Sequence, residues 1–244
     1  MAGFRSIKTQ ALVVGTMRLG EADRLVTLYT RERGRVSAVA KGVRRPLSRI
    51  GGRLEPFSLV HVLLHPGRSI YTVTGVDTIR SFQAVREELF RLEAGAQLCE
   101  AVRGLFTEEE ANPAAFNVLV RGVAKLAGAS GAGEVSVAVT GTIVKLLLVQ
   151  GFVPDLAGCV ACGTTEGLVG FGAEEGGILC SHCLETAAVG CFAVTDEGIR
   201  CLHDLVSCPL AELDPSRMEE SGLREAERMA RRLLAHYAGW QTGP

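Results

Sequence analysis

Four cysteines in the second half of the chain form two Cys-x-x-Cys pairs. Cys159 and Cys162 make the first pair and Cys180 and Cys183 the second, with 17 residues between the pairs. Two thiolates on one tight turn can supply two corners of a tetrahedron, and a second turn supplies the other two. Four thiolate ligands leave no open position for water, which is typical of structural zinc and not of catalytic zinc. The sequence therefore predicts one structural Zn²⁺ ion.

Other assignments for these cysteines stay open. A Cys-x-x-Cys pair can be redox-active, and His182, inside the second turn, could replace a cysteine as ligand. The segment 157–189 has few large apolar residues and no Lys or Arg, so we expect the metal to order it as a structural brace. The remaining cysteines lie in largely apolar surroundings and are predicted to be small core residues: Cys99, Cys191, Cys201 and Cys208.

Charge is divided unevenly along the chain. Residues 1–80 hold 14 Lys and Arg against 5 Asp and Glu, whereas residues 81–244 hold 12 against 22. The net charge of −1 therefore conceals a basic first segment. Such a split favours a nucleic acid or another polyanion as partner of this segment, and a solvated basic face without a partner is the alternative.

The densest basic stretch runs over residues 20–49. In a strand after Gly34, alternation places small apolar residues on one face and Arg35 and Lys41 on the other. More arginines follow on a loop that contains Pro46. Cations spaced in this way can follow the phosphates of a nucleic-acid backbone, and the shortage of aromatic residues predicts little base preference. The predicted phosphate contacts are Arg35, Lys41, Arg44, Arg45 and Arg49.

These cations must be positioned by β-structure, because the first 80 residues contain five short β-rich runs separated by turn residues. No helix of sufficient length lies between the runs. Five strands in so short a segment favour a closed or partly closed barrel of the oligonucleotide-binding (OB) type. The runs cover residues 8–18, 25–30, 36–43, 57–65 and 70–76.

After Arg80 the apolar residues recur every three to four positions, which is the period of amphipathic helices. The most apolar of these segments, 135–149, is too short to span a bilayer and is predicted to be a buried core helix. Thr195 is predicted to cap a helix that begins at Asp196. The other predicted helices cover 85–106, 116–126 and 223–237, with a loop at 127–133.

Together these elements predict an α+β chain. An OB-type barrel over residues 1–80 is followed by a helical domain in two parts, 81–156 and 190–244, with the four-cysteine zinc segment, 157–189, inserted between them. The first ten residues precede no long apolar run, so we expect no signal peptide.

Catalytic motifs are absent from the sequence. It contains no G-x-x-x-x-G-K-[ST], no H-E-x-x-H and no G-x-S-x-G, and the glycine-rich run 128–133 does not fit G-x-G-x-x-G spacing. Adjacent glutamates such as Glu87 and Glu88 do not face each other on a helix. We therefore expect no catalytic residue, and an enzyme that acts on nucleotides or RNA is disfavoured.

Several short motifs occur in order over nearly the whole chain. In the basic half they are Gly20-Glu21-x-Asp23, Thr30, Gly34, Ala40-Lys41-Gly42-x-Arg44-Arg45, Ser48 and Leu54-Glu55-Pro56-Phe57. In the second half they are Lys145-Leu146-Leu147, Gly151-Phe152-x-Pro154, Cys159-x-x-Cys162-Gly163, Gly176-Gly177 and Cys180-x-x-Cys183. With these motifs the sequence resembles the RecO family of recombination mediators.

The resemblance implies a non-enzymatic bacterial protein of recombinational repair, located in the cytoplasm at the nucleoid. It implies binding of single- and double-stranded DNA, annealing of complementary strands and help in loading recombinase onto coated single strands. RecR and the single-stranded-DNA-binding protein are the implied partners, and no membrane is implied as a partner. DNA contact would fall on the basic residues named above. The alternative is an RNA-binding module of translation or transcription, because an OB barrel serves RNA as readily as DNA.

Overall fold

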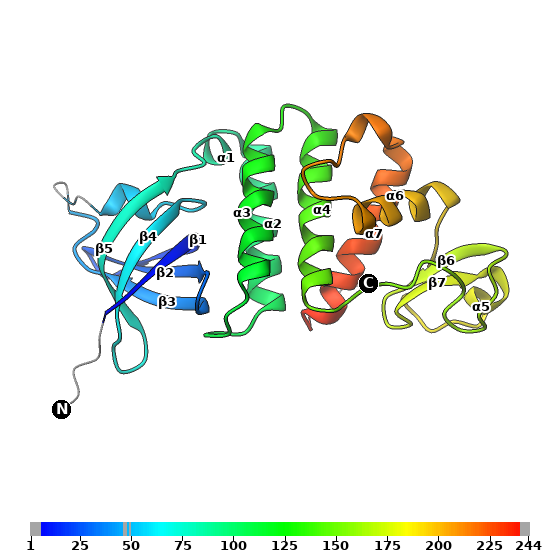
Figure 1. Ribbon diagram of the computed structural model, residues 1–244, viewed down its shortest axis with the longest axis horizontal. Coiled ribbons are helices and arrows are strands. Elements are labelled where there is room, and N and C mark those ends of the chain that lie inside the picture. The colour runs from blue at the N-terminus through cyan, green and yellow to red at the C-terminus, as the bar shows by residue number, and fades with distance from the viewer. Residues whose placement is uncertain (1–5, 46–47, 49, 240–244) are drawn as a thin grey trace. The chain divides into compact units, whose positions relative to one another are not determined.

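The computed structural model describes residues 6–45, 48 and 50–239, and it divides into two compact units, residues 1–128 and 129–244 (Figure 1). The first unit holds a β-barrel and three helices, and the second holds a helical group and a small sheet. The first unit carries 19 Lys and Arg against 12 Asp and Glu, and the second carries 7 against 15. The predicted boundaries at residues 80, 156 and 189 stay a prediction.

Five strands form the predicted barrel: β1 (Ile7–Leu19), β2 (Asp23–Thr30), β3 (Gly34–Ala40), β4 (Leu59–His65) and β5 (Tyr71–Arg80). They close in the order β1-β2-β3-β5-β4, and β4 returns to β1. Every neighbouring pair is antiparallel except β3 and β5, which are parallel. This closed five-stranded barrel confirms the predicted fold class.

Strand β3 shows how the sequence alternation builds the barrel. Val36, Ala38 and Ala40 point into the barrel core, as predicted, because every second residue of a strand faces the same side. The strand ends at Ala40, before the predicted end at residue 43. Gly42 has a φ of 65°, a left-handed conformation that turns the chain out of the sheet.

Three helices complete the first unit: α1 (Ala84–Glu87), α2 (Leu89–Leu105) and α3 (Pro113–Gly128), with a short 3₁₀ turn (Gly51–Leu54) earlier in the chain. The continuous helix predicted over 85–106 is wrong, because Glu88 adopts an extended conformation between α1 and α2. The break between α1 and α2 is explained by a tertiary contact. Arg86 donates hydrogen bonds to the carbonyls of Pro56 and Ser81, which fixes α1 to the end of the barrel.

The end of α2 lies against the outside of the barrel. The rings of Tyr29 on β2 and Phe106 are 5.5 Å apart between centroids and tilted by 59°. Arg103 donates to the carbonyl of Val14 at 3.1 Å, and Arg35 of β3 donates to the carbonyl of Arg103 at 3.2 Å. These contacts join the barrel and α2 in one unit.

The helices of the second unit are α4 (Ala132–Val149), α6 (Asp196–Ser207) and α7 (Glu220–Tyr237), with a 3₁₀ turn (Pro215–Arg217) before α7. Ten of the 18 residues of α4 are buried, and Lys145 donates to the carbonyl of Val206 at 2.7 Å. By length and composition alone, α4 could cross a membrane, but its burial is what the predicted core helix requires. The predicted cap of α6 is present, since Thr195 accepts a hydrogen bond from the Gly198 backbone N–H.

The cysteine segment folds as a small sheet with a short helix. Its strands are β6 (Leu168–Gly172), β7 (Gly177–Cys180) and β8 (Phe192–Ala193), in the order β7-β6-β8, and its helix is α5 (Ser181–Glu185). The rings of Phe171 and Phe192 pack across β6 and β8 at 5.8 Å. The apolar core of this segment is small and includes Cys159, Leu179 and Cys180.

Candidate functional site

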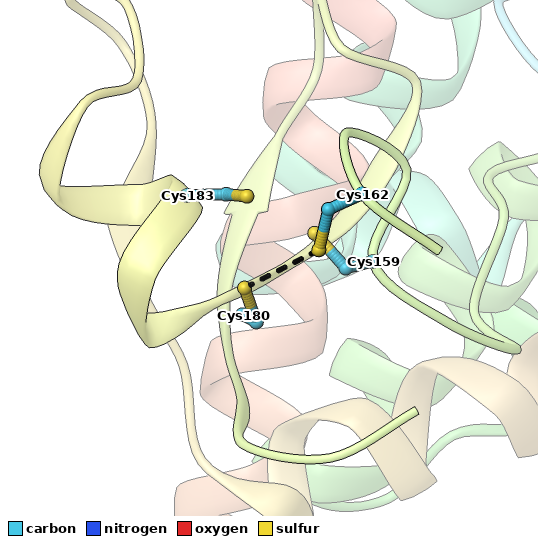
Figure 2. Close-up of side chains that lie close together, drawn as sticks. All are labelled: Cys159, Cys162, Cys180 and Cys183. Atoms are coloured by element: carbon cyan, nitrogen blue, oxygen red, sulfur yellow. Dashed lines mark hydrogen bonds between the residues drawn. The ribbon is translucent and has the colours of Figure 1, made fainter. Parts of the chain in front are cut away.

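The four predicted cysteines converge on one point. Their sulfur atoms all lie within 4.8 Å of one another, and Figure 2 shows the side chains directed inward, Cys159 and Cys162 from one loop, Cys180 from the end of β7 and Cys183 from α5. The Sγ atoms of Cys162 and Cys180 are 3.8 Å apart. In a tetrahedral site with metal–sulfur bonds of about 2.3 Å, the sulfurs lie about 3.8 Å apart. The cluster therefore fits one tetrahedral metal ion.

The first turn is held by backbone hydrogen bonds. The Gly163 N–H donates to the carbonyl of Cys159 at 2.8 Å, and Cys159 N–H donates to the carbonyl of Thr164 at 2.8 Å. Gly163 has a φ of 80°, a left-handed conformation that favours glycine directly after the second cysteine. The Val160 N–H donates to Ile178 on β7, so the first turn is fixed beside the strand that carries Cys180.

The thiols influence each other electrostatically. Backbone N–H groups, that of Cys180 first, hold the pKa of Cys159 down at about 6. Hydrogen bonding to Cys180 and Cys162 raises the pKa of Cys183 to about 12. The cluster therefore favours one thiolate but resists full ionisation, and a bound cation is what would stabilise four thiolates together.

The other candidate ligands and cysteines lie elsewhere. His182 is exposed and outside the sulfur cluster. Cys99 and Cys201 are buried, as expected for core residues, while Cys191 and Cys208 are only half-buried. Among the described residues, the four-cysteine group is the one cluster of three or more His, Cys, Asp or Glu that could hold a metal.

The described start of the predicted basic loop, residues 41–45, is braced against the turn between β1 and β2. The Gly42 N–H donates to Asp23 Oδ1 at 2.8 Å, and the Arg44 N–H donates to the carbonyl of Ala22 at 3.0 Å. The Arg44 guanidinium donates to the carbonyls of Gly20 and Glu21 at 3.2 and 3.1 Å. We call this set of contacts, between residues 20–23 and 42–44, the loop brace.

Within this loop, Lys41 and Arg45 are exposed, and among the described residues no ion pair or side-chain hydrogen bond is recorded for either. The backbone of Arg45 is fixed, since its N–H donates to the carbonyl of Gly42 and its carbonyl accepts from Ser48. Lys41 and Arg45 are thus presented to solvent within residues 41–45, which hydrogen bonds hold in place.

The remaining predicted contacts differ in their surroundings. Arg35 is half-buried, and its guanidinium donates to the carbonyl of Arg103 at the end of α2. Arg49 lies outside the described residues. None of these observations tests DNA contact, so all five positions stay predictions.

Sequence reasoning missed the role of Asp23, whose carboxylate holds the basic loop through Gly42. The signal was available, because Asp23 and Gly42 both belong to the motifs quoted above, although 19 positions separate them. It also missed the three glutamates that follow α2, Glu108 to Glu110, whose backbone lies beside β3. No short-range pattern indicates that contact.

Two family models match nearly the whole chain. The family model described as "Recombination protein O N terminal" matches residues 1–82, and "Recombination protein O C terminal" matches residues 86–243. The first covers the barrel, and the second covers the helices and the cysteine segment.

Relatives of similar length carry the same name. A DNA repair protein RecO of Rubrobacter xylanophilus is 37% identical over 242 residues, 98% of this chain and 94% of that protein. One from a Nocardioides species is 38% identical over 239 residues, 96% and 93% of the two chains. Another, from Thermobifida fusca, is 38% identical over 185 residues, 75% of each. This chain therefore belongs to the RecO family of DNA repair proteins.

Proposed function

We propose that this chain is a non-enzymatic DNA-binding protein of recombinational repair. It binds single- and double-stranded DNA on the barrel, anneals complementary strands and helps load recombinase onto coated single strands. RecR and the single-stranded-DNA-binding protein are its partners, and it acts in the bacterial cytoplasm at the nucleoid. The observation that carries the proposal is the braced basic loop, which presents Lys41 and Arg45 to solvent.

The mechanism follows from the charge of this surface. A phosphate backbone that meets fixed cations releases its condensed counterions, which drives binding without reading base sequence. Two strands held on one basic surface repel each other less, so complementary strands pair faster. Because the loop brace orders the loop before DNA arrives, little conformational entropy is lost on binding.

We assign the four cysteines to one structural Zn²⁺. When bound, the ion supplies charge compensation for the thiolates of Cys159, Cys162, Cys180 and Cys183. The chain's own residues set the geometry, since the hydrogen-bonded loop of Cys159 and Cys162 and the β7–α5 junction bring the four sulfurs within 4.8 Å of one another. Because residues 157–189 contain no Lys or Arg, the segment serves as a structural brace of the second unit, and DNA binds to the barrel.

Annealing of two complementary, dye-labelled strands tests the function directly. The wild type should accelerate duplex formation at low salt, and Lys41→Glu with Arg45→Glu should remove most of the acceleration. The matched control is Lys8→Glu with Arg121→Glu, which makes the same charge change at exposed positions of the first unit outside the basic loop. This control should anneal nearly as fast as the wild type.

Two results would contradict the proposal. Wild-type protein that neither binds nor anneals DNA would remove the function altogether. Full annealing by the Lys41 and Arg45 variant would move the site away from the barrel. The next surface to test would then be the α7 arginines that line an open hollow of about 400 Å³: Arg224, Arg228, Arg231 and Arg232.

A further inference from the structure

Three consecutive glutamates lie beside the strand that leads to the basic loop. We call Glu108, Glu109 and Glu110 the acidic strap. The Glu109 N–H donates to the carbonyl of Arg35 at 2.9 Å, and Arg35 and Glu108 form a parallel β-bridge. The strap therefore extends the sheet for a short distance at the Gly34 end of β3.

The chain is built to seat the strap closely. At Gly34, a Cβ atom would lie 1.9 Å from the carbonyl oxygen of Glu110, so only glycine leaves room there. Glu109 has a φ of 60°, a conformation that costs a non-glycine residue about 1 kcal/mol or more. Its side chain interacts with Tyr71 on the neighbouring strand β5, and this interaction, after burial, raises the pKa of Tyr71.

The strap gives the Gly34 end of β3 an excess of negative charge. Four exposed glutamates, Glu32 and the strap, lie there against exposed Arg31 and Arg33 and half-buried Arg35, while exposed Lys41 and Arg45 lie just beyond the other end of the strand. Lys41 comes six positions after Arg35, which at ~3.3 Å per residue is about 20 Å. A phosphate backbone that followed β3 from Lys41 would meet attraction first and repulsion at the strap.

We propose that the acidic strap ends the DNA path on the barrel, so that the phosphates of a bound strand are confined to the Lys41–Arg45 end of β3. This inference rests on the proposed function. Arg35 fits it, because its guanidinium already donates to Arg103 and its backbone bonds to the strap. Arg35 then positions the strap and α2 and contributes little direct phosphate contact.

The size of the effect follows from Coulomb's law. Two like unit charges ~10 Å apart in water weaken binding by a factor of about two. Three glutamates would therefore weaken it up to about eight-fold without salt. Screening over ~10 Å at 0.1 M reduces the total to about two-fold. Neutralising the strap should tighten binding by these factors, and only for strands long enough to reach it.

The test is fluorescence anisotropy with Glu108→Gln, Glu109→Gln and Glu110→Gln combined. Strands of about 5 and about 16 nucleotides bracket the site sizes of OB folds. We expect tighter binding of the long strand at low salt, little change for the short strand, and a difference that vanishes at high salt. The matched control, Glu87→Gln, Glu88→Gln and Glu93→Gln, removes the same charge near the other end of α2 and should change both strands alike and less.

An unchanged affinity for the long strand, or an equal gain in the control, would overturn the strap's role while leaving the barrel as the DNA site. No DNA binding by the wild type would overturn both. If the triple variant unfolds, Glu109→Gly serves instead, because glycine adopts a φ of 60° without strain. It should keep the fold and give about a two-fold gain on the long strand at low salt, and no gain would contradict the proposal.

Discussion

The loop brace makes a prediction that charge alone would not make. Arg44 donates two guanidinium hydrogen bonds, to Gly20 and Glu21, and these order the loop that presents Lys41. Both bonds come from one nitrogen, Nη1, and the Arg44→Lys variant keeps the charge but, with a shorter and more flexible side chain, does not place a donor at that point. At roughly 0.5 kcal/mol for each exposed bond, the loss is about 1 kcal/mol, or about five-fold weaker DNA binding.

Salt dependence separates the brace from a phosphate contact. On single strands, each phosphate contact contributes about 0.7 to the slope of log affinity against log salt. Lys41→Ala should lower the slope by that amount, whereas Arg44→Ala, which removes the brace but no phosphate contact, should weaken binding at an unchanged slope. Fluorescence anisotropy between low and moderate salt measures both quantities. Wild-type affinity in Arg44→Lys, or a fall in slope in Arg44→Ala equal to that of Lys41→Ala, would refute the reasoning.

Asp23 allows a second test of the loop brace, in which a negative and not a positive side chain is changed. Removing an acidic side chain beside a DNA site should tighten binding if only charge mattered. Because Asp23 accepts the Gly42 N–H at 2.8 Å, we predict instead that Asp23→Ala weakens binding. Tighter binding by Asp23→Ala would show that the loop needs no brace.

Three further predictions concern stability. Gly34→Ala should destabilise the first unit by several kcal/mol more than Gly20→Ala, because both have φ near 60° but only at Gly34 would a Cβ meet Glu110; chemical denaturation compares them. Chelation of the metal, or Cys159→Ser, should lower the melting temperature of the second unit in calorimetry while DNA affinity stays unchanged; loss of binding would give the cysteine segment a direct role. Burial raises the pKa of Cys99 from 9.0 to about 12. The contribution of the neutral thiol to the stability of the first unit is therefore complete below pH 9 and is lost as pH rises toward 12. The free energy of unfolding should fall over this pH range in the wild type more than in Cys99→Ala, and an equal fall in both would contradict the prediction.

The sequence predicted the parts of the fold and site that depend on neighbouring residues. The cysteine pairs are local turns, so their spacing alone predicted the cluster that the sulfur positions confirm. Alternation in β3 predicted which side chains fill the barrel, because a strand has a fixed period of two. The cap at Thr195 was likewise predictable from adjacent residues.

Features set by distant contacts could not be predicted in this way. The break at Glu88 depends on Arg86 reaching Pro56, which is 30 positions away. The environment of Arg35 depends on Arg103, 68 positions away. The alternation of residues in β3 predicted that Arg35 points away from the barrel core, but it could not show that α2 ends beside this side chain.

The measurement that tests the central claim most directly is the salt dependence of DNA binding by Lys41→Glu with Arg45→Glu. Anisotropy of a random-sequence single strand, at several salt concentrations, should show weaker binding and a slope reduced by about 1.4, since two phosphate contacts are lost at about 0.7 each. The Lys8→Glu with Arg121→Glu control should retain the wild-type slope. Equal slopes and affinities in the wild type and the Lys41 and Arg45 variant would contradict a DNA site on the barrel.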